Sequence, residues 1–412
     1  MDVPRNFYIT DENSLYKEKT YSGYKKSDVI KAYIKSIEDG KIENACNWSI
    51  ELVLSGFLEI LIEKNIIISS KFININNPKI PQYIFSNYVT ILELIKKYST
   101  HKNNINLRNN QLIRDKIAQV VCVLTLSKKY KIPSLPKTKN EDFLMQNMEL
   151  RFRAKNKELL QNVFRKGDPE EIIMPINEFI NSIYNKNINN TLYWLSWLLS
   201  WEKLNIKSYK KSYECGLREI DGVDRKYFKD LIWLIWACIF KIAFGKNKFI
   251  MEQIKYLYKI FKMNYSKSKK NSRMPLIIHA ILFITEKVDM GINLTAQKNK
   301  ILQAVSNINY LYKNLQDQKK KDSSNFYHNF GIMEEKRKMQ NFHIPNNIKK
   351  KKDYSNPDYL LQNNTIHKNI NKKSKEKKPL SIAKQKKMQQ QQHIDDINSK
   401  MNLVNQLSLQ HL

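Results

Sequence analysis

The sequence predicts an all-α protein: a solenoid-like or two-lobed helical body followed by a disordered, basic C-terminal tail. Three observations support this prediction. Glycine (9) and proline (11) are scarce in 412 residues, well below the ~7% and ~5% of an average protein, which disfavours turn-rich β-folds. Apolar residues recur at helical spacing along most of the chain up to residue 315. Near residue 316 the composition changes to polar and lysine-rich.

Residues 1–20 are polar and are expected to form a flexible segment, and residues 21–130 are expected to form the first helical lobe. Ser27 or Asp28 is suited to cap its first helix, which should end at Gly40. A second helix should follow directly and stop at Gly56. Further helical patterns cover residues 58–75, 83–98 and 111–130, although the β-branched run at 66–68 leaves a strand open there.

The best internal linker is residues 131–140, with Pro133 and Pro136, and residues 141–315 are expected to form the second lobe. A helix should start near Pro169, a residue suited to a first helical turn. The tryptophans predict two central helices, because they lie in segments that are apolar on almost every side. Those two segments are residues 190–204 and 227–244, and three amphipathic helices should follow at 249–263, 275–286 and 294–315.

The formal net charge is +32, from 71 Lys and Arg against 39 Asp and Glu. Residues 316–412 hold 20 of these cations and 9 of the anions. Such an excess is typical of proteins with an anionic partner, and lysine meets phosphate as a point charge with little base specificity. The alternative is that codons of an A+T-rich genome supply many of the lysines. The candidate nucleic-acid-binding residues are Lys267, Lys269, Lys270, Arg273, Lys349, Lys350, Lys351, Lys352, Lys372 and Lys373.

No catalytic, metal or cofactor site is predicted. The phosphate-binding loop Gly-x-x-x-x-Gly-Lys-[Ser/Thr], His-Glu-x-x-His and Gly-x-Ser-x-Gly are absent from the sequence. The four cysteines are far apart in the sequence, which fits a reducing compartment. Cys46 and Cys238 are expected to be buried thiols, and His279 a core histidine. The N-terminus lacks a secretory signal, and the longest apolar runs, 192–199 and 231–240, are too short to span a membrane.

Several short motifs stand out between residues 20 and 290. They are Tyr21-Ser-Gly-Tyr-Lys-Lys, Asn44-Ala-Cys-Asn-Trp-Ser-Ile-Glu-Leu, Ser55-Gly, Pro78-Lys-Ile-Pro, Leu107-Arg-Asn-Asn-Gln, Tyr193-Trp-Leu-Ser-Trp and Arg225-Lys-Tyr-Phe-Lys-Asp-Leu-Ile-Trp-Leu-Ile-Trp. Together they resemble an uncharacterised protein family of the nucleocytoplasmic large DNA viruses, especially the mimivirus group. The resemblance implies a viral protein located in the host cytoplasm, at the virus factory, or in the virion, and it supplies no catalytic residues.

The sequence therefore predicts a non-enzymatic viral protein that serves as an assembly or nucleic-acid-associated helical scaffold. Its expected partners are nucleic acid, bound without sequence preference, or other viral proteins. The first alternative is a structural component of the virion or virus factory whose basic charge is incidental. The second is an enzyme with an unrecognised site. Oligomeric state is left open.

Overall fold

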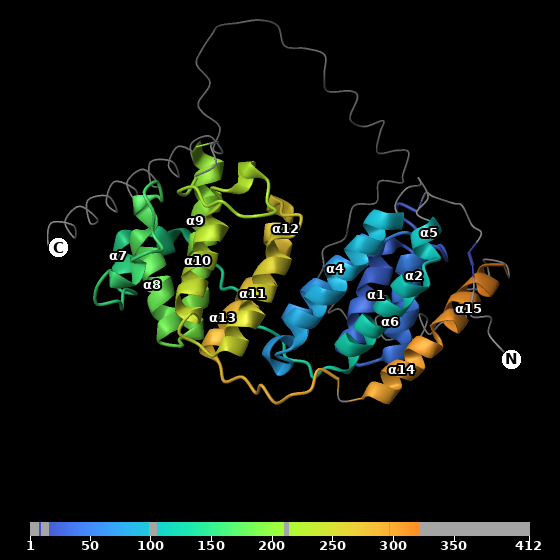
Figure 1. The fold of residues 1–412 in the computed structure, drawn as a ribbon. Coiled ribbons are helices and arrows are strands. Elements are labelled where there is room, and N and C mark those ends of the chain that lie inside the picture. The colour runs from blue at the N-terminus through green and yellow to red at the C-terminus, as the bar shows by residue number, and fades with distance from the viewer. Residues whose placement is uncertain (1–7, 10–15, 99–104, 210–213, 296, 321–412) are drawn as a thin grey trace, which may run out of the picture. The chain divides into compact units, whose positions relative to one another are not determined.

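The computed structural model describes residues 8–9, 16–98, 105–209, 214–295 and 297–320. In these ranges the chain forms helices and no β-strand, which confirms the predicted all-α fold (Figure 1). The helices up to residue 126 are α1 (Lys26–Glu38), α2 (Ile42–Leu54), α3 (Leu58–Ile68), α4 (Ile80–Tyr98), α5 (Ile105–Arg108) and α6 (Gln111–Leu126). Those that follow are α7 (Met145–Glu149), α8 (Ile173–Tyr184), α9 (Ile188–Tyr209), α10 (Leu231–Ala243), α11 (Lys248–Lys262), α12 (Lys267–Ser272), α13 (Met274–Thr285), α14 (Lys298–Ser306) and α15 (Ile308–Lys320).

Helices α1, α2 and α6 pack side by side (Figure 1). Gly40 and Gly56 end α1 and α2 with φ of 72° and 73°, a left-handed conformation that a residue without a side chain adopts at no steric cost. The predicted caps of α1 are wrong, because Ser27 and Asp28 lie inside its first turn and Lys25 takes the N-cap position.

The helix predicted over 58–75 is correct only as far as Ile68. A π-turn η1 (Ser69–Ile73) and a 3₁₀ turn η2 (Asn74–Asn76) follow, and the strand alternative is wrong. Asn74 has φ of 40°, and its side chain donates a 2.6 Å hydrogen bond to the Tyr130 carbonyl oxygen. A distant carbonyl thus stabilises the bend, which local helical periodicity does not report.

The start of α8 also differs from the prediction. Residues 170–172 form a 3₁₀ turn, and α8 begins only at Ile173. Just before this turn, the Asp168 carboxylate accepts from Gly216 N and forms a buried ion pair with Arg218 at 2.7 Å. Similarly, the helix predicted over 294–315 is divided at Asn307 into α14 and α15.

The tryptophans form the core, as predicted. Trp194, Trp197 and Trp201 on α9 are at most 4% exposed, and Trp233 and Trp236 on α10 at most 2%. Trp233 and Trp236 both meet the ring of Phe261 on α11 edge-on, at centroid distances of 6.1 and 5.5 Å. Aromatic edge-to-face contacts add to the free energy that burial of these large side chains supplies.

Helices before and after residues 131–140 pack against each other. Helix α4 contacts α11, α13 contacts η1, and α14 contacts α6. All four cysteines are buried and free, and Cys46 Sγ on α2 lies 3.8 Å from Cys122 Sγ on α6. The expected burial of Cys46 and Cys238 is confirmed.

Candidate nucleic-acid interface

The predicted cationic cluster at 267–273 forms the short helix α12 and the residue that follows it. Lys267 is exposed, whereas the side chain of Lys269 is 30% exposed and forms a 3.3 Å ion pair with Glu63. Only Lys267 therefore presents its full charge to solvent. The other two members of the cluster are buried.

Lys270 is 5% exposed and joins two helices from inside the protein. Its Nζ lies 2.7 Å from both carboxylate oxygens of Glu202 on α9 and 2.5 Å from Asp230 Oδ1, at the N-cap of α10. Burial alone lowers the pKa of Lys270, but the two carboxylates outweigh it and raise that pKa above its ordinary value. Lys270 is thus a protonated ion-pair partner.

Arg273 is 0% exposed and also serves the fold. Its Nη1 donates to the last carbonyls of α11 and the one after it, Ile260 O at 2.9 Å, Phe261 O at 3.0 Å and Met263 O at 2.6 Å. Its Nε and Nη2 bind the carboxylate of Glu63 on α3. The prediction of an accessible phosphate-binding group is therefore wrong for Arg273 and Lys270, because both charges are neutralised in the interior.

The remaining predicted residues lie outside the described residues. They belong to the tail and are Lys349, Lys350, Lys351, Lys352, Lys372 and Lys373. Their assignment stays a prediction.

The structure brings together a different cationic site, which we call the basic cleft. It has a volume of about 880 Å³ and lies between residues 133–153 and the N-terminal turns of α9. Four cations line it, two from the segment before α7 and two from the segment after it. They are Lys137, Lys139, Arg151 and Arg153.

Hydrogen bonds from side chains of α9 hold residues 136–142, which form one wall of the basic cleft. Ser196 Oγ donates to Pro136 O at 2.6 Å, and Trp197 Nε1 donates to Asp142 O at 2.9 Å. Tyr193 OH donates to Asp142 Oδ1 at 3.2 Å. Buried or half-buried hydrogen bonds to backbone oxygens hold a segment without regular structure in one conformation.

The charge balance of the basic cleft is positive. All four cations are exposed, and in the part of the chain that the structure describes none of them forms an ion pair with a carboxylate. Of the two acidic residues that line the cleft, Asp142 already accepts hydrogen bonds from Lys139 N and from Tyr193. Glu141 is the other, and it is exposed.

An aromatic ring lies among these charges. The guanidinium of Arg151 stands 4.1 Å from the centroid of the half-buried Tyr193 ring. Burial, followed by the nearby Asp142 carboxylate, raises the pKa of Tyr193 to about 12, so its hydroxyl stays a neutral donor at physiological pH. Arginine stacked on an aromatic ring is a surface on which a nucleobase can also stack.

Helix α9 contributes its N-terminal end to the same cleft. Asn189 and Asn190, in the first turn of this 22-residue helix, are among the lining residues. The partial positive charge of a helix N-terminus favours anions there. The helix end therefore adds to the attraction of the four side chains.

Sequence reasoning missed this site because its cations are not consecutive. Lys137 and Lys139 alternate with threonine in the segment that we assigned as a linker, and Arg151 and Arg153 lie in a stretch of mixed charge. A search for runs of lysine finds cations that are neighbours in the sequence. It does not find cations from separate segments that the fold brings together. The prolines at 133 and 136 were the only available signal that this segment has a defined path.

The described residues show neither a metal site nor a membrane span. No group of three or more His, Cys, Asp or Glu side chains that could hold a metal ion occurs among them. None of their helices combines the length and the apolar character that crossing a bilayer requires.

Comparison with known proteins yields no relative. No protein-family model matches the chain, and neither the curated proteins nor the solved structures that were searched contain a match. The basic cleft therefore has to be interpreted from its own chemistry.

Proposed function

We propose that this protein is a non-enzymatic helical scaffold that binds nucleic acid through its sugar-phosphate backbone, with the basic cleft as the docking site. The observation that carries the proposal is the convergence on one cleft of four exposed cations from two separate segments, none of which forms an ion pair with a described carboxylate. Elsewhere in the described chain, lysines such as Lys35, Lys229 and Lys255 pair with nearby carboxylates. Other exposed lysines, such as Lys166 and Lys203, also form no ion pair among the described residues, but they do not line this cavity. The cleft is distinguished by the grouping of four such cations around one cavity.

The chemistry of the cleft favours nucleic acid over a compact anion. Lysine and arginine contact phosphates without reading sequence, and a cleft of about 880 Å³ is large enough for several backbone groups rather than one ion. The Arg151 and Tyr193 pair offers a stacking face for a base. Binding without sequence preference and with strong salt dependence follows from such a site.

The predicted tail and the predicted viral setting are consistent with this role. Residues 316–412 carry a net positive charge, 20 cations against 9 anions, and would add phosphate contacts outside the cleft. In a virus the natural ligands are the genome and its transcripts. The same proposal includes assembly with other viral proteins, because a scaffold connects the nucleic acid that it binds to further proteins.

The alternative is a structural component of the virion or factory whose basic charge is incidental. One observation favours it: two of the four cationic residues at 267–273 stabilise the fold and not a ligand. If the excess lysines are incidental to function throughout the protein, the basic cleft has no special affinity for nucleic acid. The two proposals differ in what neutralising the cleft does.

The deciding experiment compares two quadruple variants of the full chain. In the cleft variant, Lys137, Lys139, Arg151 and Arg153 become glutamine; in the control variant, the exposed Lys166, Lys203, Lys287 and Lys298 do. Affinity for a fluorescent single strand and for a duplex is measured between 50 and 200 mM salt. We expect the cleft variant to reduce the slope of log affinity against log salt by about 3, since each lost phosphate contact removes about 0.7 to 0.9.

The control variant should keep the wild-type slope within about 1, the amount that one incidental phosphate contact contributes. Equal losses in both variants would support charge that is incidental and spread over the surface. Unchanged binding in the cleft variant would exclude the cleft as the docking site. Vesicles with anionic lipids serve as the third ligand, and tighter binding to them than to either nucleic acid would argue against the proposal.

A further inference from the structure

Apolar groups line the basic cleft beside its cations. Leu150 directly precedes Arg151 in the chain, lines the cleft and is 73% exposed. A single exposed leucine is common on protein surfaces, but this one borders a cavity together with other apolar groups. The others are Pro133, Pro136, Leu192 and the half-buried ring of Tyr193. The cleft therefore offers contacts that the phosphate groups of a ligand cannot use.

The stacked pair of Arg151 and Tyr193 is supported from inside the protein. The Tyr193 ring meets Trp194 edge-on at a centroid distance of 5.1 Å, and its hydroxyl donates to Asp142 Oδ1. The Arg151 guanidinium, 4.1 Å from the centroid of this fixed ring, belongs to a side chain that is itself exposed. A planar guanidinium in this position can stack on a base and still carry its charge.

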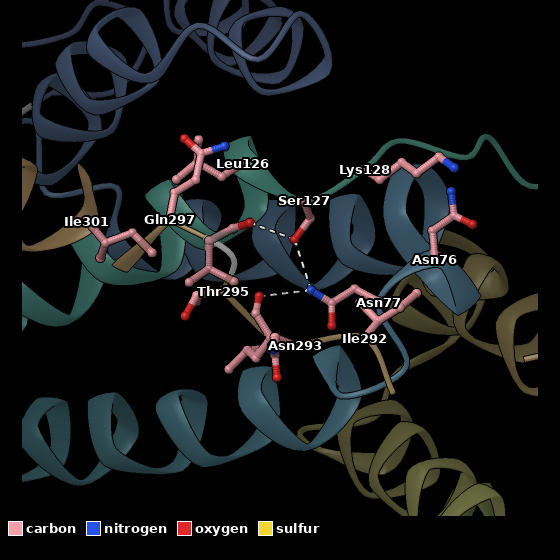
Figure 2. Close-up of a pocket in the computed structure, with 12 residues that line it drawn as sticks. Asn76, Asn77, Leu126, Ser127, Lys128, Ile292, Asn293, Thr295, Gln297 and Ile301 are labelled. Carbon is pink, nitrogen blue, oxygen red and sulfur yellow. Dashed lines mark hydrogen bonds between the residues drawn. The ribbon is translucent and has the colours of Figure 1, made fainter. Parts of the chain in front are cut away.

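A smaller cavity at the C-terminal end of α6 lacks this combination (Figure 2). It has a volume of about 300 Å³, and Lys128 is its single charged lining residue. Its other lining residues are aliphatic or carry amide or hydroxyl groups, and none is aromatic. Grouped cations and a stacking surface thus occur together in the basic cleft and not in this cavity.

The faces of nucleobases are accessible in a single strand but not in a duplex. In a double helix each base is stacked between its neighbours, so a protein meets phosphates and the base edges in the grooves. In a single strand the bases can be splayed out and stacked on aromatic rings or guanidinium planes. A volume of about 880 Å³ lies within the range of pockets that enclose small ligands, roughly 300 to 1,000 Å³. The cleft can therefore admit a few nucleotides of one strand, but not a double helix.

We infer that the basic cleft binds single-stranded nucleic acid in preference to a duplex. This inference rests on the proposed function, because the same four cations would hold the backbone. Unpaired bases would contact Leu150 and stack on Arg151, while Lys137, Lys139 and Arg153 would contact phosphates. Stacking tolerates any sequence, since every base has an aromatic face. The preference for one strand therefore comes without a preference for particular bases.

The test measures the affinity of the full chain, at fixed salt, for three fluorescent probes of equal length. They are a single strand, a duplex, and an abasic strand that keeps the phosphates and lacks the bases. We expect the single strand to bind about fivefold tighter or more than either of the other probes, which is the effect of one stacked base. Charge alone predicts the opposite order for strand and duplex, because the duplex has the higher density of phosphates.

Arg151→Lys keeps the positive charge and removes the planar stacking group. It should weaken binding of the single strand about fivefold, and change binding of the duplex and of the abasic strand by less than about twofold. Its salt slope should equal that of wild type. Arg153→Lys is the matched control, because Arg153 is exposed in the same cleft and its guanidinium donates to the Phe152 carbonyl oxygen at 2.8 Å. It should leave the binding of all three probes unchanged.

Leu150→Ala tests the apolar contact in the same way. It should weaken binding of the single strand several-fold and leave binding of the duplex unchanged. Leu302→Ala is its control, because Leu302 is 66% exposed and does not line the cleft. Circular dichroism checks that all four variants keep their helices.

Equal affinities of wild type for the single strand, the duplex and the abasic strand would overturn the inference. Equal losses from Arg151→Lys and Arg153→Lys would overturn it as well. Neither result affects the proposed function as long as the cleft variant still lowers the salt slope. If the cleft variant binds like wild type, the proposed function fails and the inference fails with it.

Discussion

Arg273 is predicted from the sequence to bind phosphate, but in the structure it stabilises the fold. It satisfies carbonyls at the C-terminal end of α11 and pairs with Glu63 on α3, 210 positions away in the chain. A helix end leaves its last carbonyls without intrahelical partners, and a buried guanidinium with several donors can satisfy several at once. Sequence spacing alone reports none of these partners.

We expect Arg273→Leu to lower the free energy of unfolding by about 3 kcal/mol or more, because it removes the donor of buried carbonyls and one of the two cations that pair with the half-buried Glu63 carboxylate. Arg273→Lys should recover only part of this, since an ammonium group lacks the planar fork. Denaturant unfolding followed by circular dichroism measures both. Lys267→Leu is the control from the same cluster and should change stability by less than about 0.5 kcal/mol. Equal effects at the two positions would contradict the assignment.

His279 is the residue for which a dependence on pH is expected. It is 0% exposed, its Nδ1 lies 3.1 Å from Ser70 Oγ, and its ring stacks on Phe283 at 4.8 Å. Burial lowers the pKa of His279 to about 3, whereas the same side chain titrates near 6.5 when unfolded. The unfolded state therefore binds the additional proton as the pH falls between these values, and acid favours unfolding.

Between pH 6 and pH 4 we expect the free energy of unfolding to decrease by about 1.4 kcal/mol per pH unit through His279. The double variant His279→Leu with Ser70→Ala should lack this component, and removing Ser70 Oγ as well avoids an unpaired buried hydroxyl. Unfolding by urea at pH 7, 6, 5 and 4 gives both slopes. If wild type and variant lose stability in parallel, His279 is not the group responsible.

At the scale of elements, α9 both fills the core and holds the basic cleft. Its tryptophans are buried in the core. Three of its side chains, Tyr193, Ser196 and Trp197, also form hydrogen bonds to the segment that carries Lys137 and Lys139. The Pro136 carbonyl and the Asp142 carbonyl are fixed by side chains about 55 to 60 positions later in the chain. The segment predicted to be a linker thus forms a wall of the basic cleft.

Removing the hydrogen bonds between α9 and the cleft wall should weaken the binding of nucleic acid without removing any charge. We expect Ser196→Ala combined with Trp197→Phe to cost at least about 1 to 3 kcal/mol of stability, because two carbonyl oxygens lose their donors and the smaller Phe side chain leaves a cavity in the core. Nucleic-acid affinity at fixed salt should fall, while the salt slope keeps its wild-type value, since the number of cations is unchanged. Thermal unfolding and fluorescence anisotropy measure the two effects. A changed salt slope would instead show that the variant makes a different number of phosphate contacts.

At the scale of the whole molecule, the charge of +32 divides between structural and available cations. Lys270 and Arg273 belong to the first kind, and the cations of the basic cleft to the second. The predicted tail sites lie outside the described residues. Their contribution has to be measured on the chain with and without them.

A chain that ends at Lys320 provides this measurement. If the tail contacts phosphates, its removal should reduce the salt slope while the cleft still binds, and adding the cleft substitutions should abolish the remaining salt-dependent binding. Circular dichroism checks that the helices are retained. A truncated chain with the wild-type slope would limit the interface to the cleft, and a complete loss on truncation alone would assign it to the tail.

The sequence by itself determined the all-α fold and most of its helices. Apolar periodicity, scarce glycine and the stops at Gly40 and Gly56 are local signals, because they depend on residues within one or two turns. Only the tertiary structure decided where those signals fail. The turns after Ile68 and the fate of the 267–273 cluster both depend on distant partners.

The same distinction separates the buried core residues, which the sequence predicts, from the cations of the basic cleft, which it does not. Burial of Trp197 and His279 could be predicted, because an apolar stretch around a residue already implies it. The basic cleft could not, because Lys137 and Arg151 become neighbours only when α9 holds their segments in place. Charge acts through distance in space, and the order of residues along a chain fixes that distance only across a few turns of helix. The sequence thus determined how much positive charge the protein carries, and the tertiary structure decided which of it can meet a ligand.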